Sequence, residues 1–284
     1  MEVEIKLPYN PPFHWNHLLD FLRYRAIENV EWVSDQYERT ISVNGSAGIL
    51  KVRHLPEEYS LKLILPKSFS RSIPQISESA KRIFDLNADP DAIKNVFKKD
   101  RKMASIVNRL PGLRIPGGWD WFEIAIRAIL GQQITVKAAR TIAGRIVKKI
   151  GTPLNGNSAT LFPTPEQMIN ASMDGMGIPT KRIEAIRLIA QASIEKKIGP
   201  DSGIPIEESI RRLCLIPGIG PWTAHYIALR TYDERDVFLP GDLGLRRGAS
   251  KLIGKNFTDV ELMKYAERWR PWRSYAVLYL WSAS

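Results

Sequence analysis

The sequence predicts an α+β protein, with an N-terminal antiparallel β-sheet and helices over about residues 1–88 and a mainly all-α helical bundle after them. Two observations carry this prediction. Before residue 88, several short runs alternate apolar and polar residues, as half-buried strands do. After residue 88, apolar residues recur at helical spacing between short Gly- and Pro-rich connections, and no convincing strand pattern remains.

The first 88 residues justify the sheet element by element. EVEIKL (2–7) and YSLKLILP (59–66) alternate like strands, and WNHLLDFLRYRAI (15–27) has the spacing of a helix. RTISVNGSAGILKVRHL (39–55) predicts two strands around Asn44-Gly45, although Gly48 favours a connection longer than two residues. Ser77 is the expected N-cap of a helix in SESAKRIFDL (77–86).

Helices account for the rest of the chain. Pro90 suits the first turn of a helix in DPDAIKNVFKKD, and a strongly apolar helix follows from Asp120 to about Leu130. Another helix is expected between Thr135 as its cap and Gly151 as its stop. Further helices are predicted in 164–172, 179–197, 205–216, 221–232, 243–254, 259–269 and 270–283.

The composition narrows the class of protein. Of the 284 residues, 44% are hydrophobic and eight are Trp, which indicates a folded globular chain. The net charge of +11 favours nucleic acid as a partner, against the alternative of a merely basic soluble surface. We find no run of eighteen apolar residues and no signal-peptide pattern, and therefore expect a reduced, intracellular protein that makes no membrane contact.

Cysteine and histidine usage argues against a metal or redox centre. The single cysteine, Cys214, excludes disulfide scaffolds, four-cysteine zinc sites and cysteine-ligated iron–sulfur clusters within the chain. It lies in an apolar stripe, so we expect a buried and inert thiol. His14 and His17 share a helix face but have no third ligand nearby in the sequence, so no metal held by side chains is expected.

A Gly- and Pro-rich hairpin, LIPGIGPW (215–222), separates two predicted helices. Pro217 restricts φ, whereas Gly218 and Gly220 permit positive φ and close backbone approach. Pro221 suits the first turn of the second helix, whose free backbone amides can hold a phosphate. From spacing alone, a plain connection between helices remains the alternative.

A lone carboxylate, Asp242, follows a Pro-Gly pair in FLPGDL (238–243). Taken by itself, such an aspartate is most often a turn former or a helix cap. Its other interpretation is a catalytic group about twenty residues after the hairpin.

Both segments resemble one known family. LIPGIGPWTAHYIALR (215–230) resembles the helix–hairpin–helix motif of the helix–hairpin–helix–GPD superfamily of DNA glycosylases, and VFLPGDLGLRRG (237–248) resembles its aspartate-bearing loop. The resemblance is closest to the alkylation-repair branch, the bacterial 3-methyladenine DNA glycosylase II type. It extends over most of the chain, through PGLRIPGGWDWFEIAIRAILGQQ (111–133), FPTPEQM (162–168) and AERWRPWRSYAVLYLW (266–281).

The resemblance implies three units and an activity. A mixed α/β unit spans 1–88, a helical subdomain with the catalytic Asp spans 89–118 and 231–284, and a second spans 119–230 with the motif at 205–230. The implied enzyme is a monofunctional glycosylase of base excision repair. It would flip alkylated purines, such as 3-methyladenine and 7-methylguanine, out of double-stranded DNA and hydrolyse their N-glycosidic bond to leave an abasic site.

The resemblance also assigns residues. Asp242 matches the family's essential aspartate, which activates water or stabilises the developing oxocarbenium ion. Trp222, Tyr226 and Trp281 match the base pocket, with core packing as their alternative. Trp222 stands where bifunctional relatives carry a Schiff-base lysine, so no lyase activity is expected. Ser282 stands where a pocket-edge tyrosine would be, which leaves the width of the pocket open.

DNA contacts follow in the same way. Gln133, with Gln132 beside it, takes the position of the minor-groove wedge, where the alkylation branch carries a leucine; solvated loop amides are the alternative. The resemblance implies no cofactor other than a monovalent cation on the hairpin carbonyls. The expected grip on phosphate comprises Pro217, Gly218, Ile219 and Gly220. The expected basic contacts, for which a solvated face is the alternative, are Arg246, Arg247, Lys251, Lys255, Arg270 and Arg273.

The expected setting is a monomer in the bacterial cytoplasm, associated with the nucleoid through DNA. Two other functions stay open at this point. One is a non-catalytic helix–hairpin–helix protein that only binds DNA. The other is a glycosylase of the same superfamily that acts on deaminated or oxidised bases.

Overall fold

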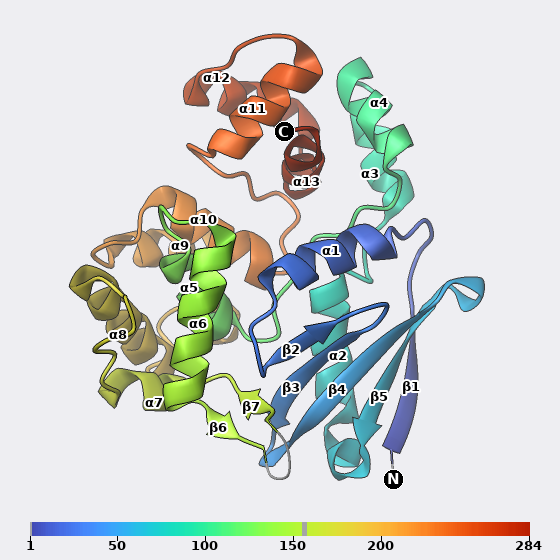
Figure 1. Cartoon of the computed structure of the whole chain (residues 1–284). Helices are drawn as coiled ribbons and strands as arrows, with labels where there is room; N and C mark the ends of the chain where they lie inside the picture. Colours follow the sequence, from blue (N-terminus) through green and yellow to red (C-terminus); the bar gives the residue numbers. More distant parts are fainter. Residues whose placement is uncertain (1, 155–157) are drawn as a thin grey trace.

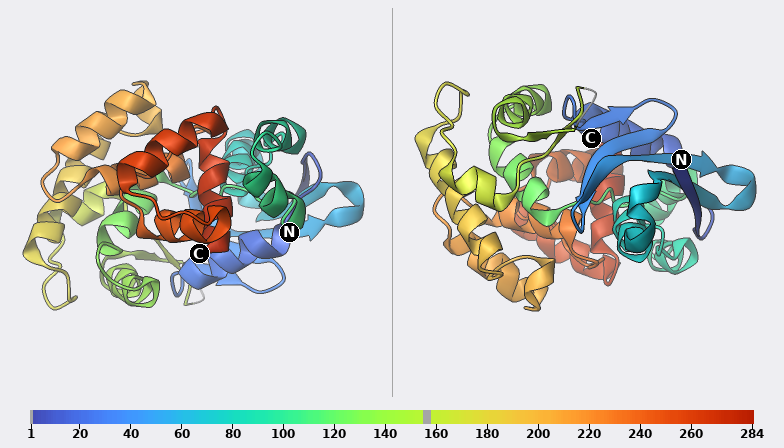
Figure 2. Two further views of the ribbon diagram at one scale, coloured as in Figure 1. Left: turned by 90° about the horizontal axis from the view of Figure 1, so that it is seen from above. Right: turned by 90° about the horizontal axis from the view of Figure 1, so that it is seen from below.

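The computed structural model of the chain describes residues 2–154 and 158–284. A five-stranded antiparallel sheet forms one end of the molecule, and the helices after it form two further groups (Figure 1). From above and from below, α7–α9 lie at the end away from the sheet, with α11–α13 over the middle (Figure 2). The predicted α+β fold class is confirmed.

The sheet has the strand order β1-β5-β4-β3-β2. Its strands are β1 (Glu2–Pro8), β2 (Glu31–Val33), β3 (Tyr37–Val43), β4 (Ser46–Leu55) and β5 (Ser60–Pro66). Strands β3 and β4 pair from Tyr37↔Val52 to Val43↔Ser46, so Asn44 and Gly45 alone form the turn. Their φ values of 49° and 78° match a tight hairpin turn, and our expectation of a longer connection was wrong.

Helices α1 (Trp15–Arg25) and α2 (Ile73–Phe84) share one core with the sheet. Helix α2 begins before the predicted cap Ser77, which is buried inside the helix. The difference arises because a 3₁₀ segment, η2 (Lys67–Ser72), runs directly into α2, so no side-chain cap separates the two.

The remaining helices lie where the periodicity predicts them, except that α3 and α4 come from a region where only one helix start was recognised. Asp89, Asp120 and Thr135 cap α3, α5 and α6 through their side chains, and Gly151 ends α6. The bounds are α3 (Pro90–Phe97), α4 (Arg101–Arg109), α5 (Trp121–Leu130), α6 (Val136–Ile150), α7 (Pro165–Asn170), α8 (Thr180–Ile194), α9 (Ile206–Leu215), α10 (Pro221–Thr231), α11 (Leu243–Ile253), α12 (Asp259–Ala266) and α13 (Arg273–Ala283). The other 3₁₀ segments are η1 (Pro56–Glu58), η3 (Pro200–Ser202) and η4 (Glu267–Trp269).

Two expectations about this region were wrong. Strands β6 (Thr152–Pro153) and β7 (Thr160–Leu161) pair after residue 88, but two-residue strands carry no alternation that a sequence pattern could show. Cys214 is exposed, because α9 buries Ser209 and Leu213 and turns the next residue toward solvent.

Three apolar cores divide the chain, and we propose them as its units. The first lies between Leu7 and Leu86. The second joins α5–α10 and also takes in Ile27 and Val30 from the sheet unit. The third joins α3, α4 and α11–α13 with the end of α10, so α10 belongs to both helical cores. Among the described helices, none has the length and hydropathy that crossing a bilayer requires.

Helices α11 and α13 approach so closely at Gly248 that a side chain has no room there. A Cβ at Gly248 would lie 1.9 Å from the backbone oxygen of Leu280. At Gly144, within α6, a Cβ would meet nothing within 4 Å.

We therefore expect Gly248→Ala to lower the free energy of unfolding by about 3 kcal/mol, through overpacking against backbone. Gly144→Ala is the matched control and should raise it by about 0.5–1 kcal/mol, because glycine is unfavourable inside a helix. Urea unfolding of both variants measures the two effects. Equal stability of the Gly248 variant and the wild type would contradict the close packing.

Candidate active site

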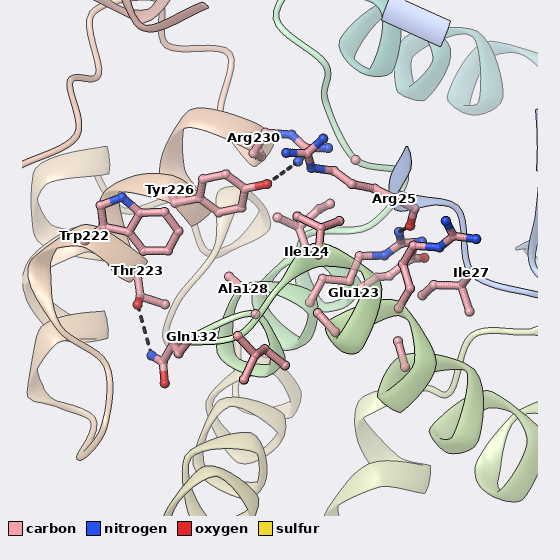
Figure 3. A pocket seen from close by; sticks show the side chains of 18 of the residues that line it. Arg25, Ile27, Glu123, Ile124, Ala128, Gln132, Trp222, Thr223, Tyr226 and Arg230 are labelled. Carbon is pink, nitrogen blue, oxygen red and sulfur yellow. Dashed lines mark hydrogen bonds and ion pairs between the residues drawn. The ribbon is translucent and has the colours of Figure 1, made fainter. Parts of the chain in front are cut away.

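A cleft of about 1230 Å³ runs between the sheet unit and the two helical cores. Its lining comes from α1, β2, β3, the 117–119 connection, α5, α6, α8, the hairpin, α10, the start of α11 and the end of α13. Figure 3 shows its wall, with Trp222 and Tyr226 projecting from α10 toward Arg25 and Ile124. The cleft thus collects side chains from all three cores.

Asp242 lies in this cleft with its side chain held by three donors. As the N-cap of α11, its Oδ1 accepts from the Leu245 backbone N–H at 2.7 Å. The indole Nε1 of Trp222 donates to Oδ2 at 2.7 Å, and that of Trp281 donates to Oδ1 at 3.2 Å. The residue is 8% exposed. Both carboxyl oxygens accept hydrogen bonds from N–H groups.

The three expected pocket aromatics meet around this carboxylate. Trp222 and Tyr226 lie one turn apart on α10, and their rings stack with centroids 5.2 Å apart and planes 11° from parallel. Trp281 arrives from α13, far along the chain, and lines the same cleft. A planar, electron-poor ring could stack on this surface.

Beyond Tyr226 the cleft is lined by two arginines, Arg230 and Arg25, that the sequence had not singled out. Arg230 Nη1 donates to the Tyr226 hydroxyl at 2.7 Å, and Arg25 lies on the same side of the ring (Figure 3). Burial raises the pKa of Tyr226, but the charges of Arg230 and Arg25 outweigh it, and the pKa is lowered. Arg230 was predictable, because it continues the i, i+4 series of Trp222 and Tyr226. Arg25 lies on α1, outside this i, i+4 series, so the spacing did not predict its position in the cleft.

A buried group of four charges joins the sheet to α5 at the cleft wall. Arg39 on β3 pairs with Glu123 at 2.7 Å, and Arg127 pairs with Glu31 on β2 at 2.6 Å and with Glu123 at 2.5 Å. The Tyr37 hydroxyl also donates to Glu31. Two acids and two bases cancel, so this ion-pair group, Glu31, Arg39, Glu123 and Arg127, adds no net charge to the cleft.

The hairpin has the geometry of a backbone grip. Gly218 takes a φ of +87°, which disfavours any side chain, while Gly220 caps α10 in an extended conformation with a φ of −86°. Ile219 is buried and its N–H donates to the Ile216 carbonyl. Pro217, Gly218 and Gly220 are exposed, as a phosphate contact would need.

Gln132 does not point outward as a wedge would. Its Nε2 donates to the Gly218 carbonyl at 2.9 Å and to the Thr223 hydroxyl at 3.0 Å, and Arg182 binds its backbone oxygen. The expectation of a Gln132 wedge is therefore corrected, since its amide joins the turn after α5 to the hairpin. Gln133 is exposed, with a φ of 56°.

Within the described part of the chain, the expected basic contacts divide into residues with an ion pair and residues without one. Arg247 and Lys251 are exposed on α11. Arg246 pairs with Asp259, and Lys255 pairs with Glu261. Arg273 is mostly buried between Asp236 and Glu267, and Arg270 pairs with the same two acids. Arg273 and Arg270 thus stabilise the start of α13, and because the Arg270 side chain keeps 49% exposure, a contact of this pair with DNA stays a prediction. Ser282, beside Trp281, contacts His17 of α1.

Comparison with known proteins agrees with this geometry. Residues 4–120 match the AlkA N-terminal domain, and residues 126–273 match the HhH-GPD superfamily base excision DNA repair protein. The chain belongs to the HhH-GPD superfamily. It is 33% identical to DNA-3-methyladenine glycosylase 2 of Escherichia coli over 97% of this chain and 95% of that protein.

Two other comparisons concern length and fold. The chain is 34% identical to a Mycobacterium tuberculosis protein named as a bifunctional transcriptional activator/DNA repair enzyme AlkA, over 99% of this chain but 57% of that protein. It therefore spans little more than half of that relative. A 3-methyladenine DNA-glycosylase from Archaeoglobus fulgidus has the same fold, with a TM-score of 0.81, 22% identity and coverage of 98% and 97% of the two chains.

The ion-pair group makes the free energy of unfolding depend on pH in the acid range. Burial raises the pKa of Glu31, but Arg127 and Arg39 outweigh it and lower the pKa to about 2, from an ordinary 4.5. Since the folded pKa is the lower one, the stabilisation is present above about pH 4.5 and is lost as the pH falls toward about 2.

We expect Glu31→Gln to lower the free energy of unfolding at pH 7 by about 3 kcal/mol, because it leaves buried arginine charge uncompensated. Denaturant unfolding between pH 7 and pH 2 should show a shallower acid loss for this variant than for the wild type. Glu4→Gln, at an exposed ion pair with Lys62, is the control and should leave the acid loss unchanged. Identical pH profiles for Glu31→Gln and the wild type would contradict the assignment.

Proposed function

We propose that this protein is a monofunctional DNA glycosylase of base excision repair. It hydrolyses the N-glycosidic bond of alkylated purines such as 3-methyladenine and 7-methylguanine in double-stranded DNA and leaves an abasic site. The observation that carries the proposal is the Asp242 carboxylate, held by two indole N–H groups beside the Trp222–Tyr226 stack. The family match to base excision repair and the relatives' names point to the same class.

Asp242 supplies the charge that the reaction needs. Breaking the N-glycosidic bond builds positive charge on the sugar, and a fixed carboxylate in a partly dry cleft stabilises it without reorganising. The same carboxylate can orient the attacking water. An alkylated purine already carries positive charge, so it departs without a dedicated acid. One carboxylate therefore suffices, and its three hydrogen bonds keep it in place.

A base can reach this carboxylate only after it has left the stack of bases in the DNA double helix. We propose that the flipped base enters the aromatic wall and that Gln133 fills the space it leaves. The exposed hairpin backbone, with a monovalent cation on its carbonyls as the only cofactor, holds a phosphate near the lesion. Arg247 and Lys251 add backbone contacts, which weaken as salt rises. The protein works as a monomer on DNA in the bacterial cytoplasm.

Asp242→Asn tests the catalytic role. We expect release of 3-methyladenine from methylated duplex DNA to fall at least about 100-fold, because a neutral amide no longer stabilises the cationic sugar. Binding to the same duplex should persist, measured by fluorescence anisotropy. Asp201→Asn, at an exposed site, serves as the control for purity and folding. Undiminished release by Asp242→Asn would leave only DNA binding as the function.

Trp222 tests the absence of lyase chemistry. An indole cannot form a Schiff base with the opened sugar, so borohydride should trap no covalent adduct between this protein and damaged or abasic duplex DNA. A lysine-bearing glycosylase–lyase provides the positive control on the same gel. A trapped band with this protein would mean that another amine attacks the sugar.

A further inference from the structure

We propose that Arg25 is a specificity-determining residue, which binds the exocyclic oxygen of 6-oxopurines in the cleft and discriminates them from 6-aminopurines. The inference deepens the proposed glycosylase function and rests on it. Four features carry it: the donors of Arg25, the three hydrogen bonds of its neighbour Arg230, the charge balance of the wall, and the position of Asp242.

Arg230 has little capacity left for a ligand. Its Nε donates to the Pro116 carbonyl, its Nη2 donates to the Gly117 carbonyl at 3.1 Å, and its Nη1 donates to Tyr226. The residue is buried. These bonds hold the 116–117 connection against α10, so Arg230 shapes this part of the cleft wall.

Arg25 is placed differently. Its guanidinium lies 3.7 Å above the centre of the Phe21 ring, and its Nη1 makes only a long 3.4 Å bond to the Phe21 carbonyl. The Tyr226 hydroxyl is its second partner. A guanidinium has five N–H donors, so most of its donor capacity remains for a ligand in the cleft that it lines.

The charges around Arg25 leave it without an acid. Glu31 and Glu123 are both taken by Arg39 and Arg127, and within residues 2–154 and 158–284 no carboxylate pairs with Arg25. Burial, with the neighbouring charge of Arg230, lowers the pKa of Arg25. Keeping the Arg25 guanidinium charged at this site therefore costs free energy. An acceptor brought by a ligand recovers part of that cost.

Asp242 and Arg25 therefore carry opposite charges at different points of the cleft wall, which Arg140, Lys181 and Arg182 also line. Asp242 accepts a hydrogen bond from Trp222. Arg230 and Arg25 lie beyond the hydroxyl of the neighbouring Tyr226 (Figure 3). A purine whose glycosidic bond faces Asp242 presents the edge of its six-membered ring toward Arg25. At position 6, 7-methylguanine has an accepting oxygen, whereas 3-methyladenine has a donating amino group. Arginine can only donate hydrogen bonds, so it binds the oxygen favourably and the amino group unfavourably.

Methylated duplex DNA tests this directly, because one substrate releases both bases. For Arg25→Met, we expect kcat/KM for 7-methylguanine to fall about tenfold, while that for 3-methyladenine changes less than about threefold. Chromatography of the released bases measures both in one reaction. Arg23→Met, at an exposed ion pair on the same helix, should leave the ratio of the two unchanged.

The outcomes separate this inference from the proposed function. If the wild type releases neither base, the proposed function fails. If Arg25→Met slows both bases equally, Arg25 has only a structural role and the inference fails, while the glycosylase stands.

A wild-type measurement covers the case in which Arg25→Met does not fold. 7-Methylhypoxanthine and 7-methyladenine, used as free-base inhibitors, differ at position 6, which is an oxygen in one and an amino group in the other, and at the adjoining N1, which donates in the first and accepts in the second. The 6-oxo base should inhibit with a constant at least about fivefold lower, and equal constants would overturn the inference.

Discussion

The two indole hydrogen bonds to Asp242 hold the site together. They tie α10, through Trp222, and α13, through Trp281, to the N-terminus of α11. Helix α10 also contributes to both helical cores, with Ala224 and Ile227 in one and Ala228 and Leu229 in the other. A displacement between these cores would therefore break the bonds to the carboxylate. The rigidity of the Asp242 carboxylate comes from the packing of the whole helical part.

A second contact sets the electrostatics of the cleft. The buried group of Glu31, Arg39, Glu123 and Arg127 joins the sheet to α5 and neutralises itself. Because these charges cancel, the remaining charges of the lining, which include Asp242, Arg25 and Arg230, determine the polarity of the cleft. The acids that join the sheet to α5 pair with Arg39 and Arg127, and this leaves them unavailable to Arg25.

Local signals predicted most of the elements correctly. Caps such as Asp120 and Thr135, and the periodic apolar residues after them, depend on neighbours within one or two turns. The errors have local causes as well. Helix α2 continues from a 3₁₀ segment without a side-chain cap, and strands β6 and β7 are too short for any pattern.

Patterns within the sequence predicted the fold class and the hairpin, and the family resemblance pointed to Asp242, Trp222, Tyr226 and Trp281 as candidates. Tertiary structure decided which side chains are free to act. Arg273 is bound to Asp236, Gln132 is turned into the hairpin, and Arg25 is brought from α1 to the wall of the cleft. The reason is physical: helix and turn formation are short-range, whereas the partner of a charge or an amide depends on which distant segments pack together.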